Sequence, residues 1–370
     1  NDDSLLAMMK LNWYVNRLRI MSGREIAHRL SEQLQLQLMR LAYRCKKNTY
    51  SLTDYNVKDF GFYCGEKNLP VLEWLDIPGV DEVGLLEAEW PALAMPWKWQ
   101  AEKNPWLVAP DTGAYWPDDF FAAINYREGN PHGDIRFVWE PARLQQLLAY
   151  ARIATNTNEA KRQQALSCLE SQLVSFVADN PIYCGPHYVS AMECSLRIVA
   201  VTHALDMVRD HIVDREILWQ SALSLIHSHA EFVSHRLSLF SSAGNHTIAE
   251  CLGLIYAALL CPEFNRAEQW LQTALPLLER EIDRQILLDG GGVEQSTWYH
   301  LLTTDMTILA AKLLQHYEQP SVVITTAGQR AVDFLKVLAS SPERLPLIGD
   351  SDSGYALSRY ANLTFTNCDA

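Results

Sequence analysis

Several signatures that would identify a chemistry at once are absent from these 370 residues. There is no GxSxG nucleophile elbow, no HExxH zinc helix, no phosphate-binding P-loop and no GxGxxG dinucleotide fingerprint. The eight cysteines form neither a CxxC pair nor a Cys/His zinc spacing, so we interpret them mainly as small buried residues in a reduced protein. We therefore predict no metal and no other cofactor in this chain.

Long apolar runs and basic charge are scarce as well. No run of about 18 apolar residues occurs, so we expect no transmembrane helix. The formal charge of −13, from 31 basic and 44 acidic side chains, argues against nucleic acid as a partner, because phosphate binding needs a dense basic face. This net charge is compatible with an anionic sugar polymer as a ligand, since a few local arginines can line a groove. The polar start Asn1–Ser4 is no secretory signal, which leaves a cytoplasmic location open.

Residues 1–133 form the first of three parts with different texture. Met9–Cys45 has helical periodicity with a break at Ser22-Gly23, and the basic face of this helix favours solvent over a polyanion. The remainder is irregular and rich in Pro, Gly and Trp, which predicts short strands and loops covering a helical body. We interpret its tryptophans as core residues rather than sugar-stacking platforms: Trp90, Trp97, Trp99, Trp106 and Trp116.

Residues 134–344 repeat long helical patterns with short connections between most of them. This rhythm is typical of antiparallel helical hairpins and predicts a mainly α protein, an incomplete α/α toroid with a central cleft. Residues 345–370 leave the pattern and predict the start of a linker or β-domain, with a strand within Tyr355–Thr366. The expected helices are 159–177, 190–208, 216–239, 247–260, 267–288, 297–317 and 322–340.

Two polar clusters stand at predicted helix starts. Asn245-His246 precedes Thr247-Ile248-Ala249-Glu250, which matches a Thr-x-x-Glu capping box and would leave Asn245 and His246 just outside the helix, facing a cleft. The segment Val293–His300 follows a Gly-rich turn and brings Glu294, Gln295, Tyr299 and His300 together. Each cluster is either an elaborate cap or part of a site.

A third cluster leads from Asn180 to Tyr188 and on to Glu193 and Arg197. The last two are four residues apart, so they share a helix face, and an ordinary ion pair is favoured over ligand binding unless they face the cleft. A glycosidase would instead need two carboxylates across a cleft. The candidates for that role are Glu193, Glu250, Asp289 and Glu294.

Together these segments resemble the heparinase II/III-like polysaccharide lyases, which include heparinases and oligo-alginate lyases. The matching segments are "NWYVNRLRIMSGREIAHRL", "DIRFVWEPARLQQLLAYA", "NPIYCGPHYVSAMECSLRIV", "SSAGNHTIAE", "EIDRQILLDGGGVEQSTWYH" and "LPLIGDSDSG". The resemblance spans nearly the whole chain, and "NH" and "EQSTWYH" are its most specific parts. It implies an incomplete α/α toroid followed by a β-sandwich, of which this chain has at most the first strand.

The resemblance also implies β-elimination on a uronate-containing polysaccharide. Tyr299 matches the catalytic tyrosine, Asn245 the residue that binds the uronate carboxylate, and His246 its neighbour. Hydrogen bonds that neutralise the carboxylate stabilise the enolate-like intermediate, while a tyrosine with a lowered pKa moves the proton. The expected substrate-binding residues are Gln295, His300, Glu193, Arg197 and Tyr188.

Two alternatives from other classes stay open on the sequence. One is a toroid glycoside hydrolase that uses a carboxylate pair, and the other is a non-catalytic protein that binds or assembles glycans.

In the family the β-sandwich supplies a further active-site histidine and often a metal site. The resemblance further suggests a bacterial protein of the periplasm or cell envelope.

Overall fold

The computed structural model describes residues 21–45, 50, 52, 54–72, 82–93, 95–100, 104–127, 129–340, 344–350, 354–358 and 363–366. They belong to two compact units, Asn1–Lys47 and Asn48–Ala370. The boundaries near residues 133 and 344 stay predictions about domain organisation. No helix within the described residues is both long enough and apolar enough to cross a membrane.

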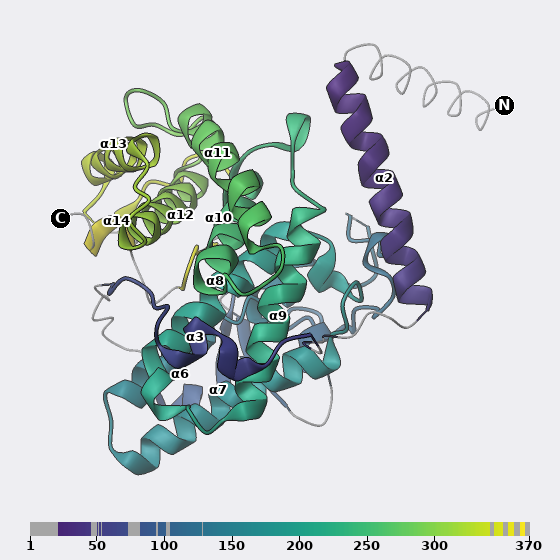
Figure 1. The fold of residues 1–370 in the computed structure, drawn as a ribbon, viewed down its shortest axis with the longest axis vertical. Coiled ribbons are helices and arrows are strands. Elements are labelled where there is room, and N and C mark those ends of the chain that lie inside the picture. The colour runs from purple at the N-terminus through teal and green to yellow at the C-terminus, as the bar shows by residue number, and fades with distance from the viewer. Residues whose placement is uncertain are drawn as a thin grey trace. The chain divides into compact units, whose positions relative to one another are not determined.

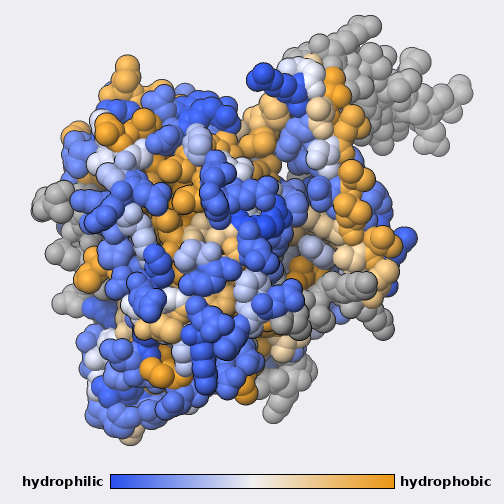
Figure 2. All heavy atoms as spheres, viewed as in Figure 1, coloured by the Kyte–Doolittle hydropathy of each residue, from blue (hydrophilic) through white to orange (hydrophobic). Residues whose placement is uncertain are grey.

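The first unit contains helix α2, Gly23–Arg44. The Ser22 hydroxyl accepts a hydrogen bond from the Glu25 amide at 3.2 Å, so the expected break at Ser22-Gly23 is the start of this helix. The predicted helical residues before position 21 lie outside the described residues. Four leucines form an exposed apolar stripe along α2, visible in orange in Figure 2: Leu30, Leu34, Leu38 and Leu41.

Eight helices form four hairpins between residues 146 and 338, where every residue is described (Figure 1). The hairpins are α6 (Gln146–Thr155) with α7 (Glu159–Asp179), α8 (Ala191–Val208) with α9 (Glu216–Ser234), α10 (Asn245–Leu260) with α11 (Ala267–Gln285), and α12 (Thr297–His316) with α13 (Val322–Leu338).

These hairpins build two layers. The first helices of the pairs, α6, α8, α10 and α12, pack against one another in that order, and each second helix packs on the outside of its partner. Burial follows the same division: every residue of α10 except His246 is buried, whereas α7 buries one face, from Ala165 to Phe176. The mainly α, incomplete toroid expected from the helix rhythm is confirmed.

The connections at the two ends of this toroid differ in length. The turns inside the hairpins are short: 156–158, 209–215, 261–266 and 317–321. The longer segments 180–190, 235–244 and 286–296 lead from the end of an outer helix to the start of the next inner helix. Because inner helices run in one direction, these three segments share one end of the toroid. The three polar clusters of the sequence lie in these segments or in the helices that start directly after them.

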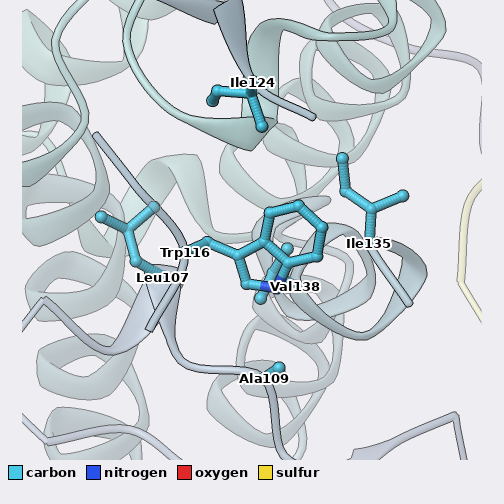
Figure 3. Packing of buried hydrophobic residues seen from close by; sticks show 6 residues of the cluster. All are labelled: Leu107, Ala109, Trp116, Ile124, Ile135 and Val138. Atoms are coloured by element: carbon cyan, nitrogen blue, oxygen red, sulfur yellow. The ribbon is translucent and has the colours of Figure 1, made fainter. Parts of the chain in front are cut away.

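The Trp-rich region contacts the helical body, for example through Trp106, whose ring packs on Phe176 of α7. Strands β1 (Glu89–Ala92) and β2 (Met95–Lys98) pair antiparallel with Trp90 opposite Trp97. Both rings are buried, as are Trp106 and Trp116, which confirms their core role, whereas Trp99 is half-buried. Trp116 lies in an apolar cluster with residues on both sides of it in sequence (Figure 3): Leu107, Ala109, Ile124, Ile135 and Val138. Short helices α3 (Gly61–Cys64) and α4 (Glu82–Leu86) lie within the described residues of this region, and α5 (Arg136–Ala142) follows it.

The expected strand near the C-terminus is wrong for Leu363–Thr366, which form the short helix α14. We attribute the placement of this segment to a buried carboxyl group on α12, which binds Thr364. Asp305 accepts hydrogen bonds from the Thr364 amide at 3.0 Å and the Thr364 hydroxyl at 2.6 Å. Asp305 is 5% exposed, and this burial raises its pKa to about 7, although the Thr364 hydrogen bonds act to lower it.

Asp305 makes the stability of the fold depend on pH. Its folded-state pKa of about 7 lies above the ordinary aspartate value of 3.8, so its stabilising contribution is complete below pH 3.8 and is lost as pH rises through 7. We expect Asp305→Asn, which keeps an acceptor for Thr364, to remove this dependence and to gain up to ~4 kcal/mol relative to wild type by pH 8. Urea unfolding of both proteins between pH 5 and 8 measures the difference. Parallel curves would show that Asp305 titrates normally.

Candidate active site

Asn245 lies at the start of the inner helix α10 and is bound by a side chain from the segment before α12. The Glu294 carboxylate accepts from the Asn245 amide nitrogen Nδ2 at 2.7 Å and from its backbone N–H at 3.1 Å. Gly244 permits this approach, because a Cβ there would lie 3.0 Å from Glu294 Oε1. A carboxylate at the N-terminus of a helix is also favoured by the helix dipole.

The predicted capping box at Thr247 is wrong, because α10 begins two residues earlier, at Asn245. The Thr247 hydroxyl instead accepts from the Gly244 amide at 3.3 Å and donates to the Ser238 carbonyl at 2.5 Å. Glu250 is buried and accepts from the amide and hydroxyl of Ser238, at 2.6 and 2.8 Å. Both side chains therefore fasten the loop 235–244 to α10. Asn245 and His246 form the first turn of the helix.

His246 is the exposed residue of an otherwise buried helix. It occupies the second position of α10, beside the Asn245–Glu294 contact. A helix buried on all other sides presents this imidazole to solvent at the end of the toroid that carries the long connections. It is therefore accessible to a ligand at the helix start.

Tyr299 lies in the first turn of α12, the inner helix that packs next to α10. Ser296 caps this helix, because its hydroxyl accepts from the Tyr299 amide at 3.2 Å. The Tyr299 ring is half-buried, and its hydroxyl donates to Asp350 Oδ2 at 3.2 Å. Asp350 belongs to the segment that follows α13, so a third part of the chain contributes to this end of the toroid.

Hydrogen bonds to backbone carbonyl groups of the segment 345–350 fasten it to the start of α12. Ser296 donates its hydroxyl to the Asp350 carbonyl at 2.5 Å, and Thr297 donates its hydroxyl to the Pro346 carbonyl at 2.6 Å. The Thr297 amide also donates to the Ile348 carbonyl at 3.1 Å. Gly349 has a φ of +73°, and a Cβ there would lie 2.5 Å from the Gln295 carbonyl oxygen. Ser296 and Thr297 of the "EQSTWYH" segment thus hold the segment 345–350 against α12.

The other two residues expected from that segment have different environments. Gln295 is exposed and adopts a φ of +53°, between the Glu294 contact and the Ser296 cap. His300 is only 5% exposed and packs on Phe334 of α13, with ring centroids 5.6 Å apart. Burial lowers the His300 pKa to about 4, although the Gly290 backbone and Asp289 act to raise it. Its substrate-binding role stays a prediction, and its geometry is that of a core residue.

Glu193 and Arg197 are not paired with each other as the four-residue spacing suggested. Glu193 is fully buried and forms a bidentate ion pair with Arg143, which follows α5, with Nε–Oε2 and Nη2–Oε1 distances of 2.8 and 2.9 Å. Both α5 and α8 pack against the 3₁₀ turn Pro186–Tyr188, and this arrangement brings Arg143 to Glu193. The sequence reasoning missed Arg143, because nothing local marks its partner.

Arg197 and Tyr188 are also buried rather than exposed to a ligand. The Arg197 guanidinium donates to the carbonyls of Ala142 and His187 and to His229 Nε2, the last at 3.0 Å. Arg197 can only donate hydrogen bonds, so Nε2 of His229 accepts and carries no proton, and His229 is neutral. Burial is the main cause that lowers the His229 pKa, and the Arg197 charge adds to it. Tyr188 packs on His229 and bonds to the Tyr50 hydroxyl. These contacts hold the loop 180–190 on the toroid.

The four carboxylates considered for a hydrolase all have structural partners. Glu193 binds Arg143 and Glu250 binds Ser238, while Asp289 accepts from the Gly291 amide at 3.0 Å within its turn. The fourth, Glu294, binds Asn245. Among the described residues, no three His, Cys, Asp or Glu side chains gather as metal ligands would.

Curated proteins with related sequences include heparin-sulfate lyases. The chain is 34% identical over 115 residues to a heparin-sulfate lyase of Bacteroides stercoris, which covers 30% of this chain and 17% of that protein. It is 27% identical over 148 residues to a heparin-sulfate lyase of Pedobacter heparinus, covering 38% of this chain and 22% of that protein. The matches thus span less than a quarter of the length of these relatives.

A solved structure supports the same fold. A crystal structure of heparinase III superposes with a TM-score of 0.51 at 19% identity, over 82% of this chain and 45% of that one. The family model "Heparinase II/III N-terminus" matches residues 114–364, which include all four hairpins and the segment with Asp350. By this match over more than half its length, the chain belongs to the heparinase II/III N-terminus family.

Proposed function

We propose that this chain is the toroid portion of a polysaccharide lyase that cleaves a uronate-containing acidic polysaccharide by β-elimination. In this proposal Tyr299 acts as general base and acid, and Asn245 and His246 neutralise the uronate carboxylate. Gln295 is an exposed candidate for substrate contact beside them. The names of the relatives, heparin-sulfate lyase and heparinase III, suggest a glycosaminoglycan as the substrate class.

One observation carries the proposal. Two polar clusters about fifty residues apart meet at the starts of neighbouring inner helices, joined by the contact between Asn245 and Glu294. Tyr299 stands in the first turn of the second helix, on the same end of the toroid. The proposal requires that one sugar residue reach the amide, imidazole and phenol groups together, as acid–base catalysis demands.

Helix geometry favours an anionic ligand at this place. The dipole of a helix attracts negative charge at its start, and at α10 the Glu294 carboxylate already binds the Asn245 backbone N–H. Asn245 adds a second side-chain N–H, and the exposed His246 imidazole adds another donor. Donors aimed at a uronate carboxylate gain strength as charge moves onto it when the C5 proton leaves, which is the condition for stabilising the transition state.

A hydrolase is supported less well by the same contacts. Glu193 and Glu250 are buried, and their oxygens are engaged by Arg143 and Ser238. Neither can flank a scissile bond without leaving its partner. A lyase, in contrast, needs no carboxylate pair, and its three proposed groups lie at the end of the toroid that carries the long loops.

The test of the proposal is the product. Elimination creates a C4–C5 double bond that absorbs ultraviolet light, whereas hydrolysis does not. We expect the complete protein to release absorbing oligosaccharides from at least one polymer in a panel of heparan sulfate, heparin, chondroitin sulfate, hyaluronan and alginate. Cleavage without absorbance would identify a hydrolase. Binding without any cleavage would move a glycan-binding or assembly role to first place.

Asn245→Ala should slow the reaction steeply. Loss of one donor to a developing anion costs roughly 10²–10³ in rate, because the stabilisation exists mainly in the transition state. The assay is initial rate by product absorbance, with polymer affinity measured separately. The matched control is Asn158→Ala, which removes another helix-start asparagine: its oxygen accepts from the Lys161 amide at 3.1 Å, at the start of the outer helix α7. Equal rate losses in both variants would mean that Asn245 acts only by stabilising the start of its helix.

A further inference from the structure

Arg284, in the last turn of helix α11, lies beside the loop that leads into Asn245. Its guanidinium nitrogen Nη2 donates to the Ala243 carbonyl at 3.1 Å. Ala243 stands two residues before Asn245, so the Cα atoms of these two residues are less than about 8 Å apart. Resting on the proposed function, we propose that Arg284 binds an anionic group of the polymer, a sulfate or a carboxylate, next to the sugar that is cleaved.

A second, buried partner orients the Arg284 guanidinium. The side chain of Glu281, one turn earlier on α11, is only 3% exposed, and its Oε2 lies 3.3 Å from Arg284 Nε. The nitrogens Nε and Nη2 are therefore directed into the protein, towards Glu281 and Ala243. One acceptor belongs to a buried side chain and the other to the backbone, so the guanidinium is held in place before a ligand arrives. Donors that are already ordered lose less entropy on binding.

The outer side of the Arg284 guanidinium can reach a ligand. The side chain is 52% exposed, and within the part of the chain that the structure describes no further hydrogen bond engages it. Nη1 therefore keeps both of its N–H groups. A guanidinium presents its N–H groups in a planar fork that matches carboxylate and tetrahedral oxyanions such as phosphate. Sulfate has the same tetrahedral arrangement of oxygens, so both anions of an acidic polysaccharide fit this donor.

Local positive charge is needed at this place because the unit that contains the toroid is acidic. The unit Asn48–Ala370 has 22 basic and 40 acidic side chains, which give a formal charge of −18. Such a surface repels a polyanion, so an acidic polymer needs cationic groups at the site itself. The exposed Glu294 adds a further carboxylate next to Asn245. Arg284 brings the opposite charge to the same turn of the chain.

The test compares Arg284→Ala with Arg280→Ala in the complete protein, on a polymer that it cleaves. Arg280 is the matched control, because it lies about 6 Å earlier along the axis of α11 and pairs with the same Glu281 at 3.5 Å. We expect Arg284→Ala to raise KM roughly 5- to 10-fold with kcat changed less than about twofold, as for a contact that is equal in ground state and transition state. Arg280→Ala removes the same charge and should change KM less than about twofold.

Arg284→Gln separates anion binding from a structural role. Its side-chain amide can still donate to the Ala243 carbonyl but carries no charge, so we expect the KM of Arg284→Ala and the Tm of wild type. The polymer affinity of wild type should also weaken more steeply with NaCl than that of Arg284→Gln. Heparan sulfate and its unsulfated backbone distinguish the two anions. A KM rise on the sulfated polymer alone identifies sulfate as the ligand, and an equal rise on both identifies carboxylate.

A wild-type KM in Arg284→Ala or in Arg284→Gln would overturn the binding role, and so would a KM rise in Arg284→Ala no larger than that in Arg280→Ala. Polymer affinity of the same variants, measured by titration calorimetry, keeps this test separate from the lyase function. If the wild-type protein releases no absorbing product, the proposed lyase function fails, while the affinities still decide the role of Arg284. If wild type is active and the affinities of wild type and Arg284→Ala are equal, the role of Arg284 alone fails.

Discussion

Tyr299→Phe is expected to abolish turnover while the protein stays folded. The substitution keeps the ring and removes only the hydroxyl, together with its hydrogen bond to Asp350. The backbone N–H of Tyr299, which completes the Ser296 cap, is unchanged. Removal of a general acid or base costs typically 10²–10⁴-fold in rate, and here one group is proposed for both proton transfers.

The measurement is the release of unsaturated product by the complete protein, with Tm and polymer affinity as parallel readouts. Binding should be nearly intact, because the hydroxyl acts on the C5 proton rather than on the carboxylate. Near-normal activity of Tyr299→Phe would rule out the proposed mechanism. A protein that loses affinity and Tm together would instead point to a structural role of the tyrosine.

The second large effect concerns stability and the residue Arg143. Its guanidinium is 6% exposed and both of its contacts with the fully buried Glu193 are short. Arg143→Ala would leave the Glu193 carboxylate in the protein interior without its partner. Breaking a buried ion pair from one side costs about 3–5 kcal/mol, because the remaining charge is neither solvated nor paired.

Urea unfolding of Arg143→Ala measures this loss as a fall in the free energy of unfolding. The control is Arg136→Ala on α5, which removes a similar ion pair with Asp134 in a partly exposed position, where the expected loss is below about 1 kcal/mol. The double variant Arg143→Met with Glu193→Leu should recover much of the stability, since it removes both buried charges. Equal losses for Arg136→Ala and Arg143→Ala would contradict the reasoning from burial.

Asp305 and Glu193 are two buried carboxyl groups whose partners differ in charge. Asp305 is bonded to neutral Thr364, and burial raises its pKa to about 7. Glu193 is bonded to a guanidinium that is charged at every accessible pH. Both carboxyls lie on inner helices, α12 and α8, which are buried on nearly all sides. A polar residue on these helices must therefore find a partner inside the protein.

Local sequence patterns predicted the helices well because they act over short distances. The run at 159–177 is α7 to within two residues, and Ser22, Asn158 and Ser321 cap helices through their own side chains. The capping box at Thr247 failed although its letters fit. Gly244 takes the cap position there, and the tertiary contact with Ser238 engages both Thr247 and Glu250.

The sequence by itself determined the mainly α hairpin fold, the core role of Trp90, Trp97, Trp106 and Trp116, and the segments at the starts of α10 and α12, since periodicity and helix-start residues encode these locally. Only the tertiary structure decided the partners: Glu294 for Asn245, Asp350 for Tyr299 and Arg143 for Glu193, at separations of 49, 51 and 50 residues. Such pairs depend on which helices the toroid packs side by side. Burial of whole helix faces supplies the free energy that selects this packing, and a short stretch of sequence does not determine it.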